Sequence, residues 1–213
     1  MLPIRNKQHW DGDRQSLRAG YGGSLFPGEN QMKPKRSVEI EAYVCIALMA
    51  VLICVCSWIT IPSMIPFTMQ TFAVFCALLL LGGKKGTAAI GLYLFMGLIG
   101  LPVFSGFRGG VGHLISPTGG YLIGFLFSGI IYTLLEPLLS GRKWFRWIVL
   151  ALAQIVCYLI GTLWFITIYG LQYVSYSFLS ACSLCVLPFI IPDCIKMVLA
   201  VILCNRIKKY VDF

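Results

Sequence analysis

Long apolar runs separated by short polar breaks make up most of this chain. The runs cover residues 42–61, 71–81, 87–101, 121–135, 147–169 and 184–203. Continuous runs of this kind are typical of membrane-spanning helices, whereas a membrane β-barrel would show weaker alternation over about ten residues. Several runs are short for a hydrocarbon core about 30 Å thick, so we expect tilted or re-entrant pieces that pack on their neighbours. The pattern predicts an all-α integral membrane protein with six transmembrane helices.

Composition agrees with this prediction and excludes a soluble domain. Of the 213 residues, 58% are hydrophobic and 12% are charged, and that charged fraction is about half the usual value for a soluble domain. The net charge of +9 would suit a nucleic-acid partner, but most basic residues lie in the N-terminal arm or beside the ends of apolar runs. Membrane topology demands that placement. We therefore expect a lipid bilayer around this protein and no nucleic acid.

The lysine and arginine positions also predict the orientation in the membrane. Six spans place both termini on the same side. The connectors of that side contain Lys84 and Lys85 and the basic residues within 142–146, and residues 206–209 add three more, whereas the opposite side contains only Arg108. Because cytoplasmic loops carry an excess of lysine and arginine, both termini are predicted to be cytoplasmic.

Polarity divides the chain into three parts. Residues 1–37 contain no apolar core and do not match a signal peptide, so we expect a disordered N-terminal extension. Met32 and a basic cluster then precede the first apolar run, and we interpret residues 1–31 as an extension from a vector or an early start codon, without a role in function. Residues 38–209 form the predicted six-helix membrane domain, and residues 210–213 form a C-terminal tail.

One pair of opposite charges lies inside an apolar run. Asp193 and Lys196 are three positions apart and share a helix face. Each charge costs about 2.5–3.5 kcal/mol at the centre of a membrane helix, and mutual pairing recovers part of that cost. Pro192 suits the first turn of a helix, which would place Asp193 at the positive end of the helix dipole near the outer face. The pair predicts either a ligand site or an ion pair that reaches the membrane interface.

The stretch 102–121 is rich in glycine and unlike the rest of the chain. It is predicted to lie on the outer side, either as a lid or binding loop or as an ordinary connector. Arg108 and the backbone N–H groups of the glycines could hold a polar group of a ligand, or Arg108 could face water. His113 is expected to be a solvated loop residue, since no carboxylate partner is evident nearby.

Motifs for common enzyme chemistries are missing from this sequence. The nine cysteines are odd in number and scattered through apolar runs, which does not suit a disulfide framework. Cys182 and Cys185 lack the further ligands of a zinc site. Residues 82–87 lack the Gly-Lys-Ser/Thr of a phosphate loop, and no nucleophile–base or metalloprotease motif occurs. We therefore expect a protein that is not an enzyme, carries no metal or cofactor and cannot hydrolyse ATP by itself.

Five separate sequence blocks stand out in this chain. The blocks are PFTMQTF at 66–72, LLGGKKG at 80–86, LIGLPVF at 98–104, SPTGGYLIGF at 116–125 and IPDCIK at 191–196. In this order they resemble the BioY family, the biotin-specific S components (substrate-binding subunits) of energy-coupling factor (ECF) transporters, and the resemblance covers essentially residues 38–209. The resemblance implies the six-helix ECF S-component fold, biotin as the transported ligand near the outer face, and a place in the plasma membrane of a prokaryote.

The resemblance also implies that Asp193 and Lys196 bind the ligand, and the chemistry of biotin fits them. Its ureido ring offers two N–H donors and a carbonyl, its sulfur ring is apolar, and its tail is a carboxylate. An aspartate accepts from N–H groups and a lysine pairs with oxygen; which end of biotin lies where stays open. The candidate binding residues are Asp193, Lys196, Arg108, Tyr93, Gln70, Phe104, Gly109, Gly110, Thr118, Gly119 and Tyr121.

The family resemblance further implies partners that supply energy, namely a transmembrane coupling (T) protein and two ATPase subunits. Small residues at every fourth position of the first helix would contact the T protein. In this chain that face would contain Ala47, Ala50, Val51 and Cys54, where valine and cysteine replace the expected alanines. Three alternatives stay open: an S component for another vitamin, a stand-alone ion- or proton-coupled carrier, and a membrane enzyme such as a hydrolase or lipid transferase.

Overall fold

The computed structural model describes residues 35–62, 65–139, 143–172 and 177–210. The chain divides into two units, residues 1–39 and 40–213. Only residues 35–39 of the first unit are described, and they begin a helix that continues into the second. The predicted extension over residues 1–31, and most of the predicted C-terminal tail, lie outside the described residues. The second unit contains every other element.

Five helices of the described chain are long and apolar enough to cross a membrane. They are α2 (Lys35–Trp58), α3 (Gln70–Leu98), α5 (Gly119–Leu135), α6 (Lys143–Gln172) and α8 (Leu187–Ile207). They match the positions of the apolar runs, with two runs falling within α3. The structure is therefore mostly helical, as the hydrophobic pattern predicted.

Short elements connect the long helices. They are strands β1 (Thr60–Ile61) and β2 (Phe67–Thr68), helix α4 (Val111–Leu114), the 3-10 turn η1 (Glu136–Leu139) and helix α7 (Phe178–Cys185). The two strands pair in antiparallel fashion with Thr60 opposite Thr68. The glycine-rich stretch contains α4 and a single bridge between Phe104 and Arg108, so it has regular structure of its own.

Helix α3 consists of two segments that fold back on each other, and they correspond to the second and third predicted runs. Gly82, with φ +78° and ψ 176°, interrupts the helical backbone, and only glycine adopts such a conformation readily. A Cβ atom on Gly86 would lie 2.8 Å from the Ala77 carbonyl oxygen, whereas nine residues of straight helix would separate the two by about 13 Å. The six runs thus form five long helices, one of them sharply bent.

The core lies where α3 packs against α5 and α8 and where α5 packs against α6. Its largest fully buried side chains include Tyr93, Phe75 and Phe104. A buried hydroxyl joins two of the helices, because Ser128 Oγ on α5 donates to the Ala153 carbonyl on α6 at 2.7 Å. The interior is therefore a packed helical core with polar groups that find partners inside it.

Large apolar side chains are exposed on the outer faces of the helices. Leu48 on α2 is 62% exposed, Leu163 on α6 is 55% exposed and Ile191 on α8 is 72% exposed. A surface with so much apolar area in contact with its surroundings suits the hydrocarbon of a bilayer rather than water. This surface agrees with the multi-pass membrane protein that composition predicted.

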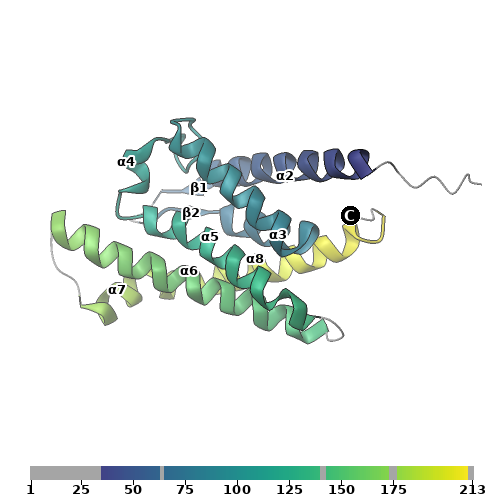
Figure 1. Cartoon of the computed structure of the whole chain (residues 1–213). Coiled ribbons are helices and arrows are strands. Elements are labelled where there is room, and N and C mark those ends of the chain that lie inside the picture. The colour runs from purple at the N-terminus through teal and green to yellow at the C-terminus, as the bar shows by residue number, and fades with distance from the viewer. Residues whose placement is uncertain (1–34, 63–64, 140–142, 173–176, 211–213) are drawn as a thin grey trace, which may run out of the picture. The chain divides into compact units, whose positions relative to one another are not determined.

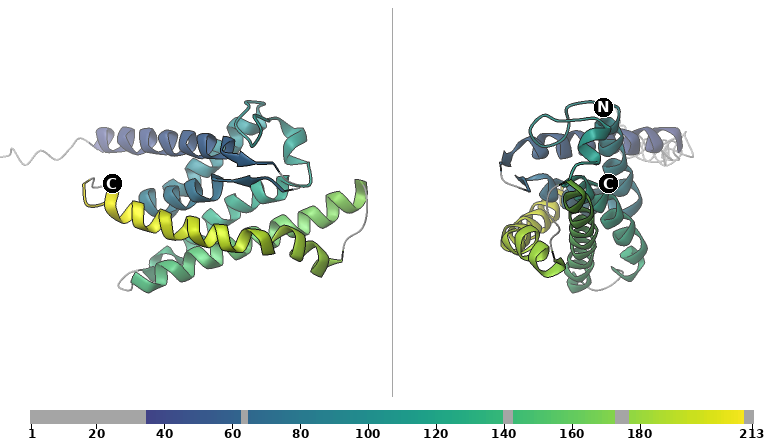
Figure 2. Two further views of the ribbon diagram at one scale, coloured as in Figure 1. Left: turned by 180° about the vertical axis from the view of Figure 1, so that it is seen from behind. Right: turned by 90° about the vertical axis from the view of Figure 1, so that its left-hand side faces the viewer.

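The elements of the second unit separate into two ends. Figure 1 shows the C-terminal end of α8, the bend of α3, the C-terminal end of α5 and the start of α6 together at one end of this unit. The paired strands, α4 and α7 lie toward the opposite end, and the view from behind in Figure 2 agrees. The glycine-rich stretch and the strand pair therefore gather at one end of the helices.

Candidate functional site

The pair predicted from the last apolar run is an ion pair in the interior. Lys196 Nζ lies 2.8 Å from Asp193 Oδ1, and the two residues are only 6% and 4% exposed. Helix α8 begins at Leu187, with Pro188 in its first turn and Pro192 inside it. The expectation that Pro192 opens the helix is therefore wrong, and Asp193 lies in the second turn rather than at the helix start.

The ammonium group of Lys196 is held by the strand pair as well as by Asp193. Its Nζ donates to the Thr68 carbonyl oxygen of β2 at 2.7 Å, and it lies 5.2 Å from the centre of the Phe67 ring. That ring stacks on Phe189 of α8, with centres 4.6 Å apart. The strand pair thus places a carbonyl and an aromatic face beside the cation, which satisfies it without water.

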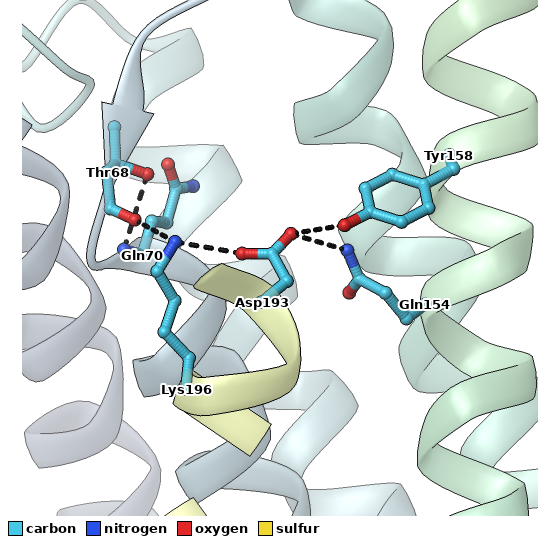
Figure 3. A network of polar contacts seen from close by, with 6 residues as sticks. All are labelled: Thr68, Gln70, Gln154, Tyr158, Asp193 and Lys196. Atoms are coloured by element: carbon cyan, nitrogen blue, oxygen red, sulfur yellow. Dashed lines mark hydrogen bonds and ion pairs between the residues drawn. The ribbon is translucent and has the colours of Figure 1, made fainter. Parts of the chain in front are cut away.

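The carboxylate of Asp193 receives two hydrogen bonds from α6. Tyr158 OH donates to Asp193 Oδ2 at 2.6 Å and Gln154 Nε2 donates to the same oxygen at 3.0 Å. Gln154 and Tyr158 are four residues apart and share one helix face, as Figure 3 shows. Three donors from two helices therefore satisfy the buried carboxylate of Asp193.

A cavity of about 70 Å³ adjoins this polar network. Both charged and apolar groups form its wall, which draws on the strand pair, the glycine-rich stretch and helices α3 and α5 to α8. The lining residues are Ile65, Pro66, Thr68, Gln70, Thr71, Ser105, His113, Thr118, Tyr121, Leu122, Phe125, Gln154, Cys157, Tyr158, Cys185, Phe189, Asp193 and Lys196.

Five residues predicted to bind ligand line this cavity: Asp193, Lys196, Gln70, Thr118 and Tyr121. The Tyr121 hydroxyl lies 3.3 Å from Thr162 Oγ1, which fixes the aromatic ring in the wall. Residues from α3, α5 and α8 that lie up to 126 positions apart in the chain thus meet around one space.

Tyr93 and Phe104, two further predicted residues, lie behind the wall rather than in it. Both are fully buried, and the edge of one ring meets the face of the other at 5.6 Å between centres and 80°. Gln70 Nε2 donates to Tyr93 OH at 3.1 Å. Tyr93 therefore positions the amide of Gln70, which does line the cavity, and Phe104 supports Tyr93.

The predicted glycines shape the loop and do not line the cavity. The N–H groups of Gly110 and Gly119 donate within the chain, to the Gly97 carbonyl at 2.7 Å and the Ser116 carbonyl at 2.9 Å. A Cβ atom on Gly109 would collide with the Leu101 carbonyl oxygen, so glycine is needed where these two backbone segments lie so close together. The expected cradle of free N–H groups from Gly110 and Gly119 is therefore absent.

Arg108 is exposed and is not part of the cavity wall. Its carbonyl oxygen accepts a hydrogen bond from the Phe104 N–H at 2.9 Å, so its backbone closes the turn between the two residues. Of the two expectations for its side chain, contact with water agrees with its exposure, although its charge lies near enough to His113 to act on that ring.

The glycine-rich stretch is fastened to the end of α2. Trp58 Nε1 donates to the Pro102 carbonyl at 3.0 Å, and the Trp58 ring stacks on Phe107 with centres 4.9 Å apart. Ser57 Oγ donates to the Val103 carbonyl at 2.5 Å. These contacts make the stretch an ordered cover at this end of the helices rather than a free connector.

His113 is a cavity residue that the sequence analysis assigned to solvent. It is half-buried, lines the cavity, and stacks on Phe104 at 5.3 Å between ring centres. Burial lowers the pKa of His113 below its ordinary value, and the nearby charge of Arg108 lowers it further. The histidine is thus only partly solvated, and the aromatic ring beneath it was not evident from the sequence.

Gln154 and Tyr158 were also missed, although the sequence contains a signal for them. A glutamine inside an apolar run, followed by a tyrosine four residues later, indicates one polar helix face. That face alone does not say which helix it meets. Thr68 gave no signal at all, because its backbone carbonyl makes the contact.

The predicted partner face on α2 is only partly exposed. Ala47 and Val51 are exposed, whereas Ala50 and Cys54 are buried within the chain at 0% and 6% exposure. A helix turns by about 100° per residue, so the four positions span about 100° of one face, and the boundary between buried and exposed surface runs through that face. Ala50 and Cys54 therefore cannot belong to an exposed contact surface.

Known proteins resemble this chain in sequence and in fold. A sequence profile of the BioY family matches residues 31–213. The biotin transporter BioY of Thermotoga maritima is 38% identical over 74% of this chain and 90% of that protein, and the probable biotin transporter BioY of Pyrococcus horikoshii is 40% identical over 68% and 81%. A crystal structure of the S component for biotin from an ECF-type ABC transporter superposes with a TM-score of 0.73 at 29% identity, covering 83% of this chain and 95% of that one. The chain therefore belongs to the BioY family.

Proposed function

We propose that this chain binds biotin and passes it across the membrane as the S component of an ECF transporter. The observation that carries the proposal is the buried pair of Asp193 and Lys196 in the wall of a cavity that seven described elements line. The relatives named biotin transporters support the ligand and disfavour the alternatives of another vitamin, an ion-coupled carrier or an enzyme.

The cavity wall offers the groups that biotin requires. The Asp193 carboxylate accepts from the ureido N–H groups, and Lys196 and the Gln70 amide donate to oxygen. The rings of Tyr121 and Phe189 supply apolar surface for the fused rings of the ligand. A cavity of about 70 Å³ is smaller than the roughly 300 Å³ of typical ligand sites, so the wall must move outward for a two-ring ligand to enter.

Energy for transport comes, in this proposal, from a T protein and two ATPase subunits in the plasma membrane of a prokaryote. The sequence supports this because it lacks a phosphate-binding loop. The exposed positions Ala47 and Val51 form the part of the predicted α2 face that is free to contact a T protein.

The topology that follows has six membrane segments and cytoplasmic termini. The two segments of α3, before and after Gly82, each count as one span because the second segment folds back against the first. The connection within α3 and the ends of α5 and α6 that are joined to each other lie at the end of the unit where α8 finishes (Figure 1). The basic residues of the sequence gather in these connections, which makes that end the cytoplasmic one.

The test is biotin binding to the purified chain in detergent, measured by calorimetric titration. Asp193→Asn and Lys196→Ala are each expected to weaken binding by at least about tenfold, because each removes a charged hydrogen bond worth about 1.5–3 kcal/mol. Lys84→Ala, an exposed position at the far end, is the matched control and should bind normally. Thiamin and riboflavin should not compete. Unchanged affinity in both site variants would refute the assignment.

A further inference from the structure

His113 lines the cavity, and histidine is the residue type whose charge ordinarily changes near neutral pH. It lies on α4, which follows Gly110 in the glycine-rich stretch, and its ring faces the same cavity as Asp193 and Lys196. Among the described residues, no hydrogen bond to its ring nitrogens is found. A half-buried imidazole with free nitrogens beside a polar cavity is available to a ligand.

The ring of His113 is held in place by packing. It stacks on Phe104 at 5.3 Å between centres and 25° between planes. Its backbone is also fixed, since the His113 N–H donates to the Gly110 carbonyl at 3.1 Å and the His113 carbonyl accepts from Ser116 Oγ at 2.6 Å. The imidazole therefore has a defined position in the wall.

The charges around His113 are unequally distributed. Arg108 lies on the same stretch and is near enough to lower the pKa of His113, after the larger effect of burial. Helix α4 packs mainly against α3 and α5, whose titratable groups here are tyrosines that stay neutral between about pH 5 and 8. The groups around the cavity from these and the other elements are Tyr93, Tyr121, Cys157, Tyr158, Cys185, Asp193 and Lys196.

These charges favour one orientation of an anionic ligand. The Asp193 carboxylate repels a second carboxylate and attracts N–H groups, so the ureido ring belongs beside it. The end of the cavity at α4 has the positive field of Arg108 and the imidazole of His113, and it has no anionic side chain among the groups named above. A carboxylate tail is therefore stabilised at the α4 end.

We propose that His113 contacts the carboxylate of biotin and makes its binding depend on pH. The proposal rests on the function proposed above. At neutral pH the ring is uncharged and donates one hydrogen bond. As the pH falls the ring gains a proton, and the imidazolium attracts the carboxylate more strongly. A bound carboxylate in turn raises the pKa of the histidine above its value in the free protein. The affinity for biotin therefore increases as the pH falls through the pKa of the complex, and it stops increasing once the pH is below the pKa of the free protein.

The test measures biotin affinity of the full chain between about pH 7.5 and about pH 5.5, where an alkyl carboxylate such as that of biotin stays ionised. Biotin should bind about three- to tenfold more tightly at the lower pH, the tenfold limit corresponding to one unit of pKa change. Biotinamide, which has no carboxylate, should change by less than about twofold over the same range. His113→Phe keeps the stack on Phe104 and should remove the pH dependence for biotin.

Two further comparisons keep the outcomes separate. His113→Gln keeps a hydrogen-bonding group but has no titratable one, so it should also lose the pH dependence. If His113→Phe fails to fold, the His113→Gln variant and the comparison of biotin with biotinamide test the role of His113. An equal slope for biotin and biotinamide, or a slope that persists in His113→Gln, would overturn the role of His113 while leaving biotin binding intact. A wild-type chain that binds no biotin at any pH would instead overturn the proposed function.

Discussion

The buried ion pair on α8 predicts a strong energetic coupling between two residues. Asp193 and Lys196 are 4% and 6% exposed and bond at 2.8 Å. Removing one partner leaves a charge inside the protein, whereas removing both leaves none. A double-mutant cycle with Lys196→Met, Asp193→Asn and the combined variant therefore separates the worth of the pair from the cost of stranding one charge.

The expected magnitudes follow from the contacts that survive each change. Lys196→Met leaves the Asp193 carboxylate with two donors but no counter-charge, so the free energy of unfolding should fall by about 3–5 kcal/mol. Asp193→Asn leaves the ammonium bonded to the Thr68 carbonyl and beside the Phe67 ring, so the loss should be smaller, about 1–3 kcal/mol. The combined variant should lose less than the sum of the two by about 2 kcal/mol or more.

The assay is reversible unfolding of the purified chain by titration of sodium dodecyl sulfate into dodecyl maltoside micelles, followed by circular dichroism. Wild-type and variant chains are compared at one pH, with the exposed Lys84→Met as the matched control for loss of a cation. Losses that add to within about 0.5 kcal/mol would mean that the two residues do not interact energetically, and the description of the site as a coupled pair would be wrong.

Three smaller predictions use the same preparations. Gly82→Ala should lower the free energy of unfolding by about 1–2 kcal/mol, because the backbone there is left-handed and a carboxylate oxygen lies 2.9 Å from the new Cβ; Gly91→Ala, with only an ordinary contact at 3.9 Å, should not lower it. Ala50→Leu should destabilise the chain by about 1–3 kcal/mol through overpacking, whereas Ala47→Leu should leave stability unchanged and weaken copurification with the T protein. Deletion of residues 1–31 should leave the dissociation constant for biotin unchanged, and a weaker constant would contradict their interpretation as an extension.

Part of the candidate site could be predicted from the sequence, because some of its residues are unusual for the segments in which they lie. Asp193 and Lys196 stand out as charges in an apolar run, and Gln70, Thr118 and Tyr121 lie in blocks shared with the BioY family. Phe104 lies in one of these blocks and Tyr93 between two of them, but sequence similarity does not distinguish a side chain in the wall from one that supports the wall.

The rest of the site depends on contacts between segments far apart in the chain. Thr68 acts through its backbone carbonyl, which every residue has, and His113 lies in a loop that looks solvated until the ring of Phe104 beneath it is seen. The first turn of α8 shows the same limit, since both Pro188 and Pro192 are compatible with a helix start and only packing selected the earlier one.

The sequence by itself determined the class of protein, the positions of the long helices and the presence of a charged pair within an apolar run, because hydrophobic transfer and the cost of burying charge act residue by residue along the chain. Only the tertiary structure decided how those helices meet: that α3 bends back at Gly82, that Gln154 and Tyr158 of α6 bond to Asp193, and that one face of α2 points inward. These outcomes depend on which side chains and backbone groups lie within about 3–4 Å of each other across helices, and many helix arrangements satisfy the same pattern of apolar and polar positions.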